Sequence, residues 1–157
     1  MGATDIYYRL PINLEFIAIA MRDESPDTVF FIDLLTGGIF SLQRPEDGNW
    51  EQAGNGYDHD IQCGFSHTPE RFVAIDALSV GEKQQIISAF AATLADQVLV
   101  GQLCQATHTR KPFTAVVYEL RDHQAELCAW RAHMEQACTA TAAEFLQERE
   151  IGIVPAL

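Results

Sequence analysis

The chain has 157 residues, of which 48% are hydrophobic and 20% charged, and one domain of this size buries roughly two thirds of its unfolded surface. This composition excludes a disordered chain, and no apolar run approaches the roughly 20 residues that cross a bilayer. The net charge of −12 disfavours binding to nucleic acid or to an anionic membrane, because an acidic surface repels phosphate groups.

The first predicted element is a short helix over Leu14–Arg22. Asn13 can cap it, and apolar residues recur on one face at helical spacing. A strand over Phe16–Met21 is the competing interpretation, because that run is almost entirely apolar.

A β-hairpin follows, with strands expected over residues 28–33 and 38–43. Between them lies the turn Asp33-Leu34-Leu35-Thr36-Gly37-Gly38. Its glycines allow positive φ angles, and the side chains of Asp33 and Thr36 can accept hydrogen bonds from backbone amides of the turn. A third strand is predicted over Glu70–Ile75, after a long loop that spans residues 44–68.

The hydrophobic period changes from two to 3.6 after Leu78, which predicts four helices. Ser79 and Glu82 form a capping box before the first, Asp96 can cap the second, Pro112 suits the start of the third, and Asp122 can cap the last. The residues expected on the apolar face of the last helix are Leu127, Trp130, Met134, Cys138, Thr141 and Phe145. The apolar tail at residues 151–155 is expected to pack on the body.

These elements predict an α+β fold in which a small antiparallel sheet packs with a C-terminal four-helix half. The hairpin and the third strand make the sheet. Because no linker separates the halves, residues 1–157 are expected to form a single domain, with residues 1–78 holding the sheet and residues 79–157 the helices.

The loop offers a candidate metal site. Carboxylates, imidazoles and a thiol lie within ten residues, and these groups are ligands for zinc and similar ions. Their spacing fits no established zinc pattern, so a solvated polar loop is the simpler interpretation, and no cofactor is expected. The candidate ligands are Asp58, His59, Asp60, Cys63 and His67.

Arg71 is a second candidate, for binding rather than catalysis. In a chain with few cations, it could bind a carboxylate or phosphate of a partner in a bidentate fashion. The simpler alternative is an internal ion pair with a nearby carboxylate. The four cysteines form no Cys-x-x-Cys pair and are predicted to be buried, reduced thiols.

The order of these motifs resembles a widespread bacterial family known only as uncharacterised protein family 0158. The matching segments are Ile32-Asp33-Leu34-Leu35-Thr36-Gly37, the strand Arg71-Phe72-Val73-Ala74-Ile75, Phe113 and Trp130. The family has no established activity, so the resemblance implies an arrangement of elements and no chemistry. Basic residues that are typical after the aromatic at position 113 are absent here, and Gly38 stands where an acidic residue is common.

The acidic charge is uneven along the chain and bears on function. Up to Leu78 there are 13 acidic and 4 basic residues, and from Ser79 onward there are 9 and 6. A solvated face is the simplest interpretation, and a protein partner that binds the acidic N-terminal half is the alternative.

The sequence also lacks the motifs of a nucleophilic or phosphate-binding enzyme. The N-terminus lacks a secretion signal, so we expect a cytoplasmic interaction or regulatory protein without catalytic activity. The runner-up is a protein that binds a metal or a small ligand through the loop. A homodimer is a further hypothesis, because the helical half carries more apolar surface than its own sheet can cover.

Overall fold

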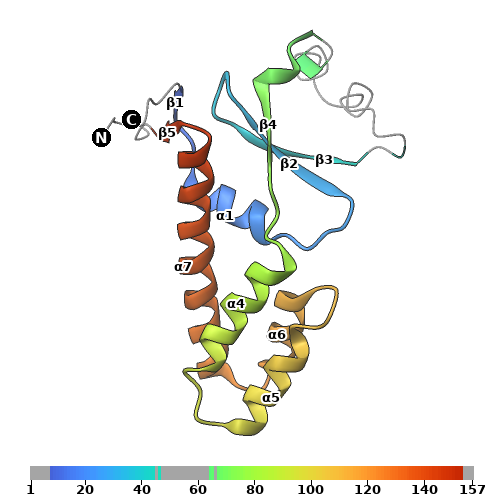
Figure 1. Ribbon diagram of the computed structural model, residues 1–157, viewed down its shortest axis with the longest axis vertical. Helices are drawn as coiled ribbons and strands as arrows, with labels where there is room; N and C mark the ends of the chain where they lie inside the picture. The colour runs from blue at the N-terminus through green and yellow to red at the C-terminus, as the bar shows by residue number, and fades with distance from the viewer. Residues whose placement is uncertain (1–7, 45, 47–63, 66, 154–157) are drawn as a thin grey trace.

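A computed structural model describes residues 8–44, 46, 64, 65 and 67–153. The sheet lies at one end of the molecule and three helices lie at the other, while the long helix α7 runs beside both (Figure 1). The strands are β1 (Tyr8–Leu10), β2 (Thr28–Asp33), β3 (Ile39–Gln43), β4 (Phe72–Ile75) and β5 (Ile151–Ile153). The helices are α1 (Leu14–Arg22), α4 (Val80–Ala91), α5 (Gln97–Ala106), α6 (Pro112–Glu119) and α7 (Gln124–Glu148).

The three-stranded sheet has the order β3-β2-β4 and is antiparallel throughout. Strand β2 is central, because Phe30 lies opposite Ser41 on β3 and opposite Ile75 on β4. The α+β fold class is therefore confirmed, with a small antiparallel sheet and a helical C-terminal half.

The hairpin turn has the chemistry that its residues predict. Gly37 adopts φ +79°, the Asp33 carboxylate accepts a 2.9 Å hydrogen bond from the Leu35 amide, and the Thr36 hydroxyl accepts one of 3.1 Å from the Gly38 amide. A side chain at Gly37 would also lie 3.1 Å from the Pro11 ring. The turn therefore requires glycine for its backbone angle and for close packing against the segment after β1.

Both faces of this sheet are covered. Alternate residues of β2 and β4 point toward the body and join a core cluster that extends from Leu10 to Ile151. Intervening residues of β2 and β4 join residues of β3 and Phe65 in a second cluster on the outer face, made of Phe31, Leu42, Phe65 and Phe72 with Val29 and Phe40 packed against it. A side chain at Gly64 would lie 2.6 Å from the Phe72 ring, so the backbone at Gly64 approaches that ring in a way that only glycine permits.

Three of the four helix starts predicted for the helical half are confirmed. Ser79 and Glu82 exchange the two hydrogen bonds of a capping box, the Asp96 carboxylate accepts from two amides of α5, and Pro112 occupies the first turn of α6. Trp130 is fully buried on α7, between the rings of Phe90 and Phe113 at centroid distances of 5.4 and 5.5 Å.

The fourth helix start was predicted wrongly. The residue that precedes α7 is His123, whose side chain makes no capping hydrogen bond, and the side chain of Asp122 is 84% exposed. The backbone of the preceding turn is instead closed by a 2.9 Å hydrogen bond from the His123 amide to the Leu120 carbonyl.

Other sequence predictions also need correction. The third strand begins at Phe72 rather than Glu70, because Pro69–Arg71 forms a 3₁₀ turn and proline donates no backbone hydrogen bond. Cys138 is buried as expected, but Cys104 and Cys128 are exposed. Cys63 lies outside the described residues.

The two ends of the described chain meet, which the sequence did not predict. Strand β1 pairs in parallel with β5, so that Tyr8 lies opposite Ile151 and Leu10 opposite Ile153. Within the described residues, no helix is both long enough and apolar enough to span a membrane.

Candidate functional site

Arg71 forms an ion pair with Asp33 on the hairpin. Its Nε and one terminal guanidinium nitrogen each lie 2.7 Å from a different oxygen of the Asp33 carboxylate. The two side chains are only 12% and 8% exposed, and a bidentate pair of this kind is rigid as well as strong. The internal ion pair is thus the alternative that the structure contains, while binding of a partner by Arg71 stays a prediction.

This ion pair joins two of the motifs that carry the family resemblance. Asp33 belongs to the hairpin turn and Arg71 immediately precedes β4, and the Leu34 amide also donates a 2.8 Å hydrogen bond to the Arg71 carbonyl. Burial acts to raise the pKa of Asp33, but hydrogen bonds from Arg71 and from the Leu35 amide outweigh it and lower the pKa. The carboxylate therefore stays ionised and locks the turn to the neighbouring strand.

The predicted metal site lies almost entirely outside the described residues. This applies to Asp58, His59, Asp60 and Cys63, while His67 is described and exposed. Among the residues that the structure describes, no group of three His, Cys, Asp or Glu side chains is arranged to hold a metal ion. The metal hypothesis stays a prediction.

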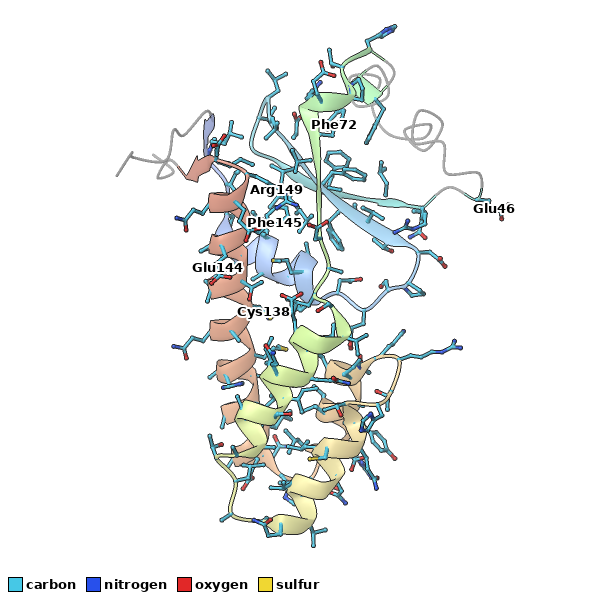
Figure 2. All side chains as sticks on the ribbon, viewed as in Figure 1. Glu46, Phe72, Cys138, Glu144, Phe145 and Arg149 are labelled. Atoms are coloured by element: carbon cyan, nitrogen blue, oxygen red, sulfur yellow. The ribbon has the colours of Figure 1, made fainter. Side chains whose placement is uncertain are left out.

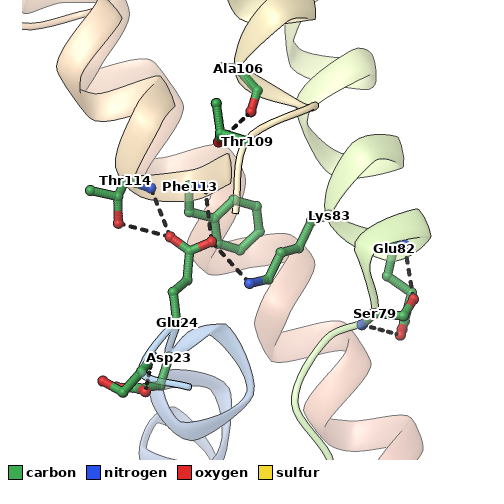
Figure 3. A network of polar contacts seen from close by, with 10 residues as sticks. Asp23, Glu24, Ser79, Glu82, Lys83, Ala106, Thr109, Phe113 and Thr114 are labelled. Atoms are coloured by element: carbon green, nitrogen blue, oxygen red, sulfur yellow. Dashed lines mark hydrogen bonds and ion pairs between the residues drawn. The ribbon is translucent and has the colours of Figure 1, made fainter. Parts of the chain in front are cut away.

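A second buried ion pair, which the sequence did not reveal, connects the two halves of the chain (Figure 3). Glu24 follows α1, and its carboxylate lies 2.9 Å from Lys83 Nζ on α4. It also accepts hydrogen bonds from the Phe113 and Thr114 amides, at 3.2 and 2.8 Å, and from the Thr114 hydroxyl. Glu24 therefore caps α6 from 89 residues away.

The electrostatics of Glu24 suit this role. Burial acts to raise its pKa, but the hydrogen bonds from Lys83 and Thr114 outweigh burial and lower the pKa. A carboxylate at a helix N-terminus also benefits from the positive end of the helix dipole. Because α6 lacks a local side-chain cap at Lys111, Glu24 supplies from a distance what Ser79 supplies locally to α4.

An acidic hollow lies where the sheet end meets the helical half. It measures about 190 Å³ and is bordered by α7, the end of α1, the β4–α4 connection and the start of α4. Figure 2 shows Glu144, Phe145 and Arg149 on the part of α7 beside the sheet. The charged residues that line the hollow are Asp76, Glu82, Glu144, Glu148 and Arg149.

Among the described residues, Arg149 is the one cation that lines this hollow, and it is already engaged. Arg149 donates a 2.7 Å hydrogen bond to Asp76, and its guanidinium carbon lies 3.7 Å from the centre of the Phe145 ring. Glu144 and Glu148 are exposed. The hollow therefore presents an excess of hydrogen-bond acceptors with negative charge, which suits a cationic ligand.

The residues of the acidic hollow and the buried Glu24 differ in how far the sequence could have revealed their positions. Glu144 and Glu148 are four apart on the predicted last helix, so their shared face could have been recognised. Asp76 and Glu82 reach the same hollow only because the chain leaves the sheet at Ile75 and starts α4 beside α7. Glu24 stands in an acidic turn, and nothing local distinguishes it from Asp23.

Comparisons with known proteins agree with the resemblance. The sequence pattern of the uncharacterised protein family UPF0158 matches residues 10–156 of this chain. A UPF0158 protein of Pseudomonas aeruginosa is 21% identical over 143 residues, which cover 90% of this chain and 86% of that protein. No solved structure matches the chain.

Proposed function

The chain belongs to the uncharacterised protein family UPF0158, and on this premise we propose that it is a non-catalytic, cytoplasmic interaction protein with an acidic binding surface. Its partner is a protein with a basic segment. The acidic hollow between the sheet and α7 carries this proposal, because the described part of the chain lines it with four carboxylates and one cation.

The size and chemistry of the hollow favour a basic side chain. A volume of about 190 Å³ is comparable to that of one long side chain and too small for most cofactors. Glu144 and Glu148 can accept hydrogen bonds from a lysine or arginine, and charge-assisted bonds of this kind are stronger than neutral ones.

The charge of the N-terminal half supports the same partner chemistry. Glu24 and Asp33 are engaged in buried ion pairs and Asp76 forms an exposed ion pair with Arg149, while Asp27 and Glu46 are exposed. Asp76 lines the hollow, so one carboxylate of the first half lies beside the carboxylates of α7. Complementary charge of this sort accelerates association and selects the sign of the partner.

The experiment is a quantitative pull-down from native cytosol, treated with nuclease and read by mass spectrometry. The bait proteins are the wild type and a Glu144→Gln/Glu148→Gln variant. We expect a near-stoichiometric protein partner on the wild type and its loss from the variant, because the variant removes two of the carboxylates that line the hollow.

A matched control removes the same number of charges from the other end of α7. Asp122→Asn/Glu126→Gln alters residues at the solvated start of this helix and should retain the partner. A blank result with the wild type would contradict the proposal, as would equal retention by the wild type and the hollow variant.

A further inference from the structure

Helix α1 presents an apolar stripe to solvent on the face opposite its buried side. Phe16 is 55% exposed and Ile19 is 44% exposed, although a nine-residue helix of this apolar composition would normally bury both. Ile17, Ala18 and Met21 already face the core. The helix is therefore apolar on two sides and packs within the chain on only one of them.

Two opposite charges frame this stripe. Glu15 lies in the first turn and Arg22 in the last turn of α1, and both share the face of Ile19, because residues at i, i+4 and i+7 align on a helix. Along the axis they are about 10 Å apart, too far for an ion pair within one copy. Neither side chain forms an ion pair with any residue that the structure describes.

We infer that this face of α1 binds the same face of a second copy of the chain, in an antiparallel arrangement about a twofold axis. Such an interface is self-complementary, since each copy supplies the same patch. Glu15 of each copy then meets the partner's Arg22, and Phe16 and Ile19 of both copies pack between the two ion pairs. A parallel arrangement would instead bring like charges together.

The surface next to α1 completes the contact. A shallow hollow of about 110 Å³ lies between α1 and α7, lined by Ile19 and Arg22 on α1 and by Glu135 and Thr139 on α7. Glu15 and Ala18 also line it, so the hollow is mixed in character and can receive a side chain of the second copy that has both apolar and polar atoms. Because α1 is short, the contact falls at the small end of specific interfaces, so the dimer is weak and reversible.

Sedimentation equilibrium of the untagged full chain over a wide concentration range tests this inference. We expect the wild type to show a reversible monomer–dimer equilibrium and Ile19→Lys to remain monomeric. Since Ile19 is exposed, circular dichroism should show an unchanged fold. Val98→Lys is the matched control, because Val98 is 73% exposed on α5, and this variant should dimerise as the wild type does.

Charge exchange tests the antiparallel arrangement. Glu15→Arg alone and Arg22→Glu alone each disrupt two ion pairs across the axis, and should weaken association by about tenfold. The double variant Glu15→Arg/Arg22→Glu recreates both pairs with their signs exchanged and should recover most of the affinity.

A wild type that stays monomeric throughout would overturn the inference, and so would a dimer that Ile19→Lys leaves intact. A double variant as weak as the single ones would overturn the antiparallel arrangement. None of these substituted residues lines the acidic hollow. The dimer and the proposed function are therefore tested independently of each other.

Discussion

At the scale of single residues, two buried carboxylates hold distant parts of the chain together. Glu24 pairs with Lys83 and Asp33 pairs with Arg71, and all four side chains are at most 12% exposed. Separating such a pair by removing one partner leaves an uncompensated buried charge, which is far more costly than losing an exposed ion pair. The stability of this protein should therefore depend strongly on a few polar residues.

Glu24→Gln should lower the free energy of unfolding by roughly 3–5 kcal/mol. Gln preserves the shape of the side chain but leaves the Lys83 ammonium buried without a counter-charge. Urea unfolding followed by circular dichroism measures the change. Asp122→Asn is the matched control: its ion pair with Arg121 is exposed and 3.8 Å long, so the cost should be below about 1 kcal/mol. Equal effects of the two substitutions would contradict the structural role of Glu24.

The same carboxylates predict how stability depends on pH. The folded protein lowers the pKa of Glu24 and of Asp33 below their ordinary values of 4.5 and 3.8. At acidic pH the unfolded chain then binds more protons than the folded one, so the free energy of unfolding decreases as the pH is lowered. The stabilisation that the ionised Glu24 and Asp33 supply is fully present above their ordinary pKa values. It is lost as the pH falls through the lower pKa values that these groups have in the folded protein.

Urea unfolding between about pH 5 and pH 3 should reveal this loss. The Glu24→Gln variant should show a smaller decrease over the same interval, because Gln does not titrate. Val98→Ala, which alters an exposed residue without an ionisable group, should keep the wild-type slope. If Glu24→Gln has the wild-type slope too, Glu24 does not have the lowered pKa that its contacts imply.

At the scale of elements, local chemistry predicted most boundaries. The capping box at Ser79, the cap at Asp96 and the proline at Pro112 each act within one turn of their own helix. The hairpin was predictable for the same reason, because its turn is stabilised by the side chains of Asp33 and Thr36. Asp122 was a plausible cap by residue type, but the backbone after α6 places His123 at that position.

Two glycines of different function offer a direct comparison at this scale. Gly37→Ala should destabilise the protein by at least about 1–2 kcal/mol, the cost of a left-handed backbone with a side chain, because Gly37 has φ +79°. Gly101→Ala should stabilise it by roughly 0.8–1 kcal/mol, since Gly101 lies within α5 and a Cβ there meets nothing within 4 Å. Thermal unfolding of both variants measures the difference in stability. If both substitutions stabilise the protein, or both destabilise it, the contrast between the left-handed turn at Gly37 and the open helical position at Gly101 is contradicted.

At the scale of the whole molecule, segments distant in sequence share one apolar core. The main cluster extends from Leu10 at the end of β1 to Ile151 at the start of β5. Helix α1 packs mainly on α7, although more than 100 residues separate them in the chain. Strand β5, which follows α7, is therefore part of the packed body of the protein.

Ile151→Ala should therefore lower the free energy of unfolding by about 2–5 kcal/mol, the usual cost of truncating a buried isoleucine. Ile151 is only 6% exposed and belongs to the strand that pairs with β1. Val98→Ala, at an exposed position of α5, should change stability by at most about 0.5 kcal/mol. Chemical denaturation distinguishes the two, and a negligible effect at Ile151 would contradict its place in the core.

The candidate site shows the limits of sequence reasoning at this scale. The sequence marks Arg71 as a rare cation and allows an internal ion pair as one of its two interpretations. It assigns Asp33 only to the turn, because no local pattern links residues 38 apart. Of the five candidate metal ligands in the loop, only His67 lies among the described residues, and it does not line the acidic hollow.

The helices, the hairpin, the family and the acidic balance of the chain can be predicted from the sequence, because periodicity, caps, turn residues and charge act over a few residues. That Glu24 caps α6, that β1 pairs with β5, and that Asp76 lines the same hollow as Glu144 and Glu148 became evident from the packed structure alone. These contacts depend on how the elements pack, and the energy that selects them is shared among many side chains that are distant in sequence.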